Sequence, residues 1–264
     1  MHTVVLVKPV PDIEKVNFDA EKGKIDWSST PLEINPFDLN ALEVAVQIKE
    51  RLGGTVTAIG MGPLSAESAL RDALAKGADR AILLADSRFD GADTHATSYT
   101  LAAALRRIGD FDLVVCGERA VDVETGQVGP EVAEYLGLAQ LTYVSKITEV
   151  REEKICVVSE MSDRAYLMES SLPVLITVTK DVNKPRLPTL QDKLKARKAK
   201  IEVWNASDLA DTADVAKFGS SGSLTSVLKL VTPPEQGRKG EVFKGDDAAT
   251  KLARALSDEG MLGR

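Results

Sequence analysis

Apolar and polar positions alternate in blocks along the first 136 residues, and these blocks predict strands followed by helices. Four apolar runs have the length and β-branched content of buried strands. They are Thr3–Lys8, Thr55–Gly60, Arg80–Ala85 and Leu113–Cys116. After each run the apolar residues recur at helical spacing, so that Leu42, Ala45 and Leu52, for example, share one helix face. Buried strands that alternate with amphipathic helices predict a parallel sheet covered on both faces.

The pattern changes beyond about residue 145. Three strand-like runs follow without an intervening helix long enough for a crossover, which predicts an antiparallel or mixed edge. They are Lys154–Ser159, Arg164–Met168 and Val174–Thr179. The proline-containing segment Asn183–Leu190 then ends the compact part, giving an α/β domain over residues 1–184 and an arm over residues 185–264. The arm has too little apolar surface for its own core, so we expect it to wrap a partner chain.

The predicted fold class is therefore α/β, with a doubly wound, mostly parallel, Rossmann-like sheet, an antiparallel edge and an extended C-terminal arm.

Composition and charge exclude several classes of function. A net charge of −7 argues against nucleic-acid binding. No apolar run approaches the length of a membrane span, and the opening residues lack a signal-peptide pattern, so we expect a cytoplasmic protein. Two cysteines in apolar runs and two scattered histidines predict buried thiols and no metal site.

The richest segment for chemistry is Gly117–Pro130, GERAVDVETGQVGP, between a buried strand and a short helix expected over Gly129–Leu136. Gly126 and Gly129 allow backbone amides to approach a ligand closely. The start of the helix adds unpaired N–H donors and the positive end of a dipole. This combination suits a nucleotide phosphate. A tight strand-to-helix turn that binds nothing has the same composition and stays open as an alternative.

The topology places two more segments beside this loop. In doubly wound sheets, ligands bind outside the carboxyl ends of the strands, at the point where the strand order reverses. Asn35–Asp38 follows the first strand, and Gly60–Pro63 follows the second. The sequence therefore predicts a nucleotide-binding site built from three strand ends.

Six stretches along the chain resemble, in order, the beta (small) subunit of electron-transfer flavoproteins. They are TVVLVKPVPD, INPFDLNALEVAVQIKE, IGMGP, LRDALAKGADRAILL, CGERAVDVETGQVGP and NKPRLPTLQDKLKARKAKIEVW. The resemblance covers nearly the whole chain. It implies a heterodimer with an alpha subunit, a nucleotide held on this chain and a C-terminal arm that embraces the alpha subunit.

The resemblance also implies which residues bind the nucleotide. Carried over to this sequence, the cofactor-binding residues are Leu6, Asn35, Phe37, Asp38, Met61, Gly117, Arg119, Ala120, Asp122, Glu124, Thr125, Gly126, Gln127, Val128, Gly129 and Val132. Some have simpler interpretations. Leu6 and Met61 are equally suited to packing, Asn35 to helix capping and Phe37 to anchoring the core.

The identity of the nucleotide decides the function that the resemblance implies. Family members that only shuttle electrons hold structural AMP and tend to have a polar run resembling DDDxNQTGQ. This chain has DVETGQVGP instead, which resembles the D-x-[DE]-T-[AG]-Q-V-G-P pattern of electron-bifurcating members. Those members hold a second FAD that accepts a hydride from NADH. We therefore expect FAD, with AMP as the alternative. The chain would then be a subunit of an NADH-oxidising oxidoreductase complex, with no catalytic triad or acid/base pair of its own.

The implied partners are the alpha subunit, ferredoxin as a low-potential acceptor, and a dehydrogenase of the acyl-CoA or lactate type. The segment Arg186–Lys200 resembles the family's recognition loop, in which Leu190 is the apolar anchor and Arg186 and Lys193 belong to its basic rim. A solvated basic helix is the simpler interpretation of this segment. A regulatory adenine-nucleotide-binding module remains a more distant alternative for the whole chain.

Overall fold

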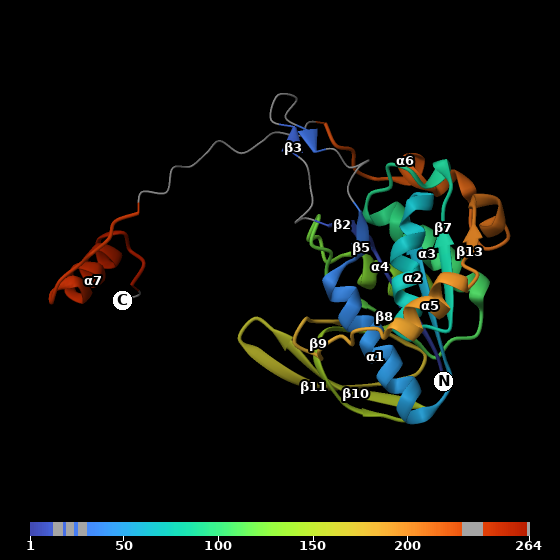
Figure 1. Cartoon of the computed structure of the whole chain (residues 1–264), viewed down its shortest axis with the longest axis horizontal. Coiled ribbons are helices and arrows are strands. Elements are labelled where there is room, and N and C mark those ends of the chain that lie inside the picture. The colour runs from blue at the N-terminus through green and yellow to red at the C-terminus, as the bar shows by residue number, and fades with distance from the viewer. Residues whose placement is uncertain (13–17, 20–23, 26–30, 229–239, 263–264) are drawn as a thin grey trace. The chain divides into compact units, whose positions relative to one another are not determined.

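The computed structural model describes residues 1–12, 18–19, 24–25, 31–228 and 240–262. Its central feature is a nine-stranded sheet in the order β11-β10-β9-β12-β8-β1-β6-β7-β13 (Figure 1). The strands of this sheet are β1 (His2–Leu6), β6 (Thr55–Met61), β7 (Arg80–Leu84), β8 (Leu113–Gly117), β9 (Ala139–Val150), β10 (Lys154–Met161), β11 (Arg164–Ser171), β12 (Val174–Val178) and β13 (Glu202–Trp204). Pairs from β9 through β12 to β13 are parallel, whereas β9, β10 and β11 pair antiparallel. This confirms the predicted α/β class and an antiparallel edge. The run Val174–Thr179, predicted to belong to that edge, instead forms β12, which lies inside the sheet and pairs parallel with both β8 and β9.

The helices follow the predicted blocks closely. They are α1 (Pro36–Leu52), α2 (Glu67–Ala75), α3 (Thr94–Ile108), α4 (Val128–Leu136), α5 (Leu190–Lys198), the short α6 (Gly219–Gly222) and α7 (Ala248–Asp258). Two small ladders pair β2 (Pro9–Pro11) with β5 (Leu32–Ile34), and β3 (Phe18–Asp19) with β4 (Lys24–Ile25).

Two hydrophobic clusters, one on each face of the sheet, account for the alternation of strand and helix. The helices α1 and α2 pack on one face, against side chains such as Val5 and Val115. The helices α3 and α4 pack on the other, against Val4 and Val114. Successive residues of one strand point to opposite faces, so a strand between two helical layers must be apolar throughout.

Three local predictions were wrong. Leu52, at the end of α1, is 41% exposed because the apolar face of the helix ends before its last turn. Cys156 is only half-buried and lies beside Glu169, 3.2 Å from Sγ to Oε2, because that face of β10 is open to solvent. The sequence places His95 in the first turn of a helix and favours a solvated side chain, whereas its ring is half-buried and packs against Tyr135 at 5.6 Å between centroids.

Contacts divide the chain into two compact units, Met1–Val227 and Leu228–Arg264. Residues 185–227 belong to the first unit, in which β13 pairs with β7 and the Arg71 guanidinium of α2 donates to Ala196 O of α5 at 2.9 Å. In the second unit α7 has no buried residue. Among the described residues, every helix is too short or too polar to span a bilayer.

The outer edge of the sheet is formed by β11. Its Tyr166 is 44% exposed and its Leu167 is 77% exposed. Within the described residues, β11 pairs only with β10, so one side of its backbone is left without a ladder.

Candidate functional site

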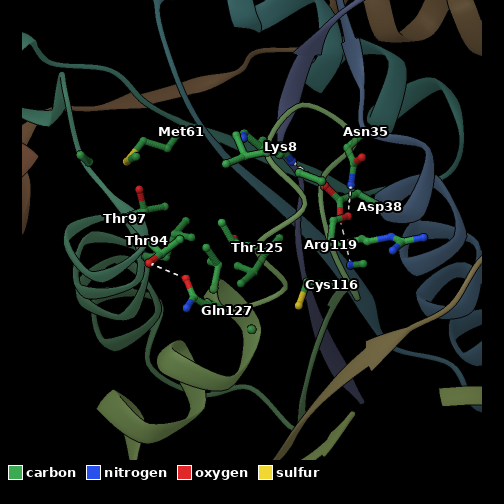
Figure 2. Close-up of a pocket in the computed structure, with 18 of the residues that line it drawn as sticks. Lys8, Asn35, Asp38, Met61, Thr94, Thr97, Cys116, Arg119, Thr125 and Gln127 are labelled. Atoms are coloured by element: carbon green, nitrogen blue, oxygen red, sulfur yellow. Dashed lines mark hydrogen bonds between the residues drawn. The ribbon is translucent and has the colours of Figure 1, made fainter. Parts of the chain in front are cut away.

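The strand order reverses between β8 and β1, and a cleft of about 420 Å³ opens at the carboxyl ends of these two strands. The three segments that the sequence predicted all reach this cleft, and Figure 2 shows their side chains around it. The lining residues include Leu6 from β1, Asn35 and Asp38 from the start of α1, Met61 from β6 and most of the loop from Gly117 to Gly129. The cleft therefore lies where ligands bind in doubly wound sheets.

The start of α1 holds the glycine-containing loop in place. Asn35 is buried, its side-chain amide donates to Arg119 O at 2.9 Å, and its Oδ1 accepts the Val121 N–H at 3.2 Å. No side-chain capping bond of Asn35 to α1 is formed. The side chain thus positions the loop, in place of the helix cap that was the simpler interpretation.

Asp38 joins the ends of the two central strands. Its Oδ2 accepts the Lys8 N–H and its Oδ1 accepts the Gly117 N–H, both at 2.8 Å. Burial raises the pKa of this carboxyl to about 6, against the lowering effect of its hydrogen bonds and of the Lys8 charge. The buried Phe37 beside it lies under the Arg119 guanidinium, 5.2 Å from the ring centroid.

The loop before α4 presents a row of backbone donors to the cleft. Glu124 and Gly126 adopt left-handed conformations, with φ of 55° and 64°. Among the described residues, the N–H groups of 125–129 donate to no protein acceptor. Those of Gln127, Val128 and Gly129 are the unpaired amides expected at a helix start. Such a concave set of amides next to a positive dipole end binds anions.

The cleft also includes a segment that the sequence analysis missed, from Phe89 to Thr97 and on to Leu101. Thr94 donates its hydroxyl to Gln127 Oε1 at 3.1 Å, so α3 and the glycine-containing loop meet across one end of the cleft (Figure 2). Asp93 caps α3 through the Ala96 N–H at 3.0 Å. This segment follows β7 at the same sheet edge, so the topological argument that located the other three segments could have located it.

Most of the predicted cofactor-binding residues are brought together. Those that line the cleft are Leu6, Asn35, Asp38, Met61, Gly117, Arg119, Ala120, Thr125, Gly126, Gln127, Val128 and Gly129. Four do not line it. Phe37 and Val132 are buried in the protein, Glu124 is exposed, and Asp122 pairs with the Lys8 ammonium at 2.6 Å. Besides the Phe89–Leu101 segment, Val7, Lys8 and Cys116 line the cleft without having been predicted, and Glu118 and Val123 line it as members of the predicted loop.

The residues predicted for partner binding lie elsewhere, between β12 and α5. Leu190 is 74% exposed at the start of α5, and Lys193 is exposed one turn later. Arg186 is held within the chain, where its guanidinium donates to the carboxylates of Glu43 and Glu50. Its contact with a partner stays a prediction. The described residues contain no group of three or more metal-ligating side chains.

Comparison with known proteins gives consistent relatives. The sequence matches the model of the electron transfer flavoprotein domain over residues 23–209. It is 41% identical over 260 residues to the electron transfer flavoprotein subunit beta of Thermoanaerobacterium thermosaccharolyticum, an alignment that covers 97% of this chain and 98% of the relative. The same subunit of Clostridium acetobutylicum is 41% identical, covering 98% and 99%. Protein FixA of Bradyrhizobium diazoefficiens is 39% identical, covering 98% and 90%.

Proposed function

The chain belongs to the electron transfer flavoprotein family, and on this basis we propose that it is a beta subunit that binds FAD in the cleft between β1 and β8. The single observation that carries this proposal is the row of amides at residues 125–129, which have no acceptor among the described residues and belong to the lining of a cleft with apolar walls.

The residues of the cleft fit a dinucleotide that joins a charged centre to flat rings. The free amides and the start of α4 suit a diphosphate, whose negative charge they would neutralise. Apolar side chains at the walls, such as Met61, Leu101 and Val128, suit a ring system. The cleft extends past the three predicted strand ends to the start of α3.

When bound, FAD supplies the redox chemistry, accepting a hydride from NADH and passing one electron to ferredoxin and one, through the FAD of the alpha subunit, to a dehydrogenase of the acyl-CoA or lactate type. The chain's own residues bind and orient. Gly126–Gly129 hold the phosphates, Asn35 fixes the loop, and Thr94 with Gln127 closes one end of the cleft.

Two surfaces serve the partners in this proposal. Residues 185–264 contact the alpha subunit, and α7 is an amphipathic helix with none of its residues buried in this chain. The exposed Leu190, flanked by Lys193, is the docking anchor for the dehydrogenase. An apolar side chain inside a charged rim is typical of transient docking sites.

The test is cofactor extraction from the co-purified heterodimer, in wild type and in two matched variants. Gly126 and Gly137 have nearly the same left-handed backbone, with φ of 64° and 65°, and stand at opposite ends of α4. Leucine at either position costs about 1–2 kcal/mol of backbone strain. Gly126 lines the cleft, and a Cβ there would lie 3.3 Å from Glu118 O, whereas Gly137 does not line it and has open space around it.

We expect two FAD per heterodimer in the wild type and in Gly137→Leu. We expect one FAD in Gly126→Leu, because the FAD of the alpha subunit stays bound. Two FAD in Gly126→Leu contradict the placement of the site. One FAD and one AMP in the wild type replace the bifurcating function with the shuttling alternative. If the chain alone is a stable, flavin-free dimer that binds ATP, it is a regulatory nucleotide-binding module.

A further inference from the structure

The two central strands of the sheet separate before they reach the cleft. The parallel ladder between β1 and β8 ends at the pair Val5–Val115. Beyond it β1 stays with β6, where the Val7 N–H donates to Ile59 O at 2.7 Å. On the other side β8 stays with β12 as far as the pair Gly117–Val178. The two halves of the sheet thus part beneath the nucleotide site.

Asp38 spans this split. One carboxylate oxygen accepts the N–H of Lys8, just past β1, and the other accepts the N–H of Gly117, at the end of β8. Both bonds are 2.8 Å long, and Asp38 is only 5% exposed. The side chain therefore supplies the cross-connection that the ladder no longer makes.

The surroundings of Asp38 leave room for this bridge and for little else. A Cβ on Gly117 would lie 2.6 Å from Asp38 Oδ1 and 2.5 Å from Phe37 Cβ, so only glycine lets β8 approach so closely. Each of the two oxygens faces an N–H donor, and the ionised carboxylate is a strong acceptor at both. Protonation leaves one oxygen as a hydroxyl, which is a much weaker acceptor, and an amide would turn a donor toward one of those N–H groups.

We propose that Asp38 is a positioning residue that joins the two halves of the sheet beneath the nucleotide site, and that this chain retains its nucleotide only while the carboxylate is ionised. The proposal rests on the proposed function and adds a regulation of the same site. It assigns Asp38 to the geometry of the protein and not to a contact with the ligand.

Among the described residues, the charge that lowers the pKa of Asp38 is that of Lys8, in the segment after β1. Lys8 itself pairs with Asp122 of the glycine-containing loop. Cys116 of β8 stays a neutral thiol, because burial and the Asp38 charge raise its pKa. Arg119 lies over Phe37, and Asn35 contributes a neutral side chain that lowers the pKa of Asp38.

Protonation of Asp38 does not destabilise the folded chain relative to the unfolded chain. The pKa of Asp38 in the folded chain, about 6, lies above its ordinary value of 3.8. The folded state therefore binds the proton more tightly, and acidification through this window does not remove folding stability at Asp38. A loss of nucleotide near pH 6 would thus occur without unfolding, which separates this bridge from ordinary acid denaturation.

The experiment measures the dissociation of FAD from the co-purified heterodimer between pH 5.5 and 7.5, with circular dichroism recorded on the same samples. FAD is the suitable probe because it has no phosphate monoester, a group that titrates near pH 6. The variants are Asp38→Asn and a matched control, Asp79→Asn. Asp79 also accepts a strand N–H, that of Val56 at 2.8 Å, but at the end of the strands opposite to the cleft.

We expect the wild type to change from two FAD per heterodimer toward one as the pH falls through about 6, with its circular dichroism unchanged. We expect Asp38→Asn to bind the second FAD about tenfold or more weakly at pH 7.5, the effect of losing a hydrogen bond to a charged acceptor, and to lose the pH dependence. Asp79→Asn should behave as the wild type.

Each other outcome is decisive. The proposal is overturned if FAD retention in the wild type does not change with pH. It is also overturned if retention rises on acidification, because a neutral Asp38 then repels the diphosphate less. This measurement needs no variant. Wild-type affinity in Asp38→Asn overturns it as well. If the wild type holds AMP in place of the second FAD, the proposed function fails, and the bridge is then judged by whether Asp38→Asn loses AMP at pH 7.5.

Discussion

Replacing Arg186 with alanine should release the segment that carries Leu190. The Arg186 guanidinium donates from Nε to Glu43 Oε2 at 2.8 Å and from Nη1 to Glu50 Oε1 at 2.6 Å. Its backbone N–H also donates to Glu43 Oε2 at 3.1 Å. These bonds attach the chain between β12 and α5 to α1. The exposed Leu187 follows directly, and Leu190 begins α5.

The size of the effect follows from the burial of Glu43, which is 6% exposed. Removing one partner of a buried pair costs about 3–5 kcal/mol, because the other charge is left without compensation. A third of the Arg186 side chain is exposed, so water can solvate part of the vacated space, and we expect about 2–3 kcal/mol. At 1.4 kcal/mol per tenfold change, local opening becomes about 30- to 150-fold more frequent.

Hydrogen exchange of the co-purified heterodimer measures this opening directly. Peptides that cover residues 180–195 should exchange faster in Arg186→Ala at pH 7. Burial raises the pKa of Glu43, but its bonds from Arg186 and Gln47 outweigh burial and leave the pKa below 4.5. A lowered pKa means that the contribution is complete above 4.5 and is lost as the pH falls through the folded value. The difference between variant and wild type should therefore disappear on acidification.

A matched arginine elsewhere provides the control. Arg88 also donates to a carboxylate through two nitrogens, here that of Asp86. Its other side-chain bond goes to Ser207, so it bonds no residue of the segment 180–195 in the described part of the chain. Arg88→Ala should leave exchange at residues 180–195 unchanged. Exchange in Arg186→Ala within twofold of the wild type would refute the view that this network holds the segment.

Two further predictions concern stability, each read from the first transition in chemical denaturation of the heterodimer. Gly129→Ala places a Cβ 2.6 Å from Thr177 Cγ2 and 2.9 Å from Cys116 Sγ, and should lower the free energy of unfolding by about 1–3 kcal/mol through overpacking. Gly240→Ala, with open space around it, should cost little. Equal effects of the two changes would argue against tight packing of α4 on the sheet. Asp93→Ala removes the cap of α3 and the bond to the Leu224 N–H, and should cost about 1–2 kcal/mol at pH 7. The pKa of Asp93 is lowered to about 2, because its hydrogen bonds outweigh burial. The stability difference between Asp93→Ala and the wild type should therefore persist to about pH 4 and vanish as the pH falls through 2. A difference that stays constant with pH would contradict the role of the ionised Asp93.

The strands β1, β6, β7, β8 and β12 could be predicted because they are buried on both faces. Such strands are continuous apolar runs, and their boundaries follow from composition alone. The short parallel strand β13 is only partly buried and was missed. Likewise, β9 could not be found this way. Its apolar residues Leu141, Val144, Ile147 and Val150 recur every third position, since Tyr143 has a left-handed backbone and the register with β10 shifts twice. Irregularities of this kind remove the period of two that identifies a half-exposed strand.

The candidate site was located by topology, but the roles of its polar residues depend on distant partners. Asp38 was predicted to bind the cofactor, whereas its carboxylate bonds the N–H groups of Lys8 and Gly117, 79 residues away in the second case. Glu43 and Glu50 lie two turns apart on α1, and their partner Arg186 follows 143 and 136 residues later. Local sequence patterns do not contain such pairings, because the fold brings them together.

The unpaired side of β11 has a consequence for handling the chain by itself. A long strand with free N–H and C=O groups and with Tyr166 and Leu167 in solvent is a template on which a second molecule can add its own strand. Lysine, proline or a covering helix usually blunts such a template, and between Ala165 and Met168 this strand has none of those protections among the described residues. Self-association through β11 should thus increase with concentration when the chain is produced by itself.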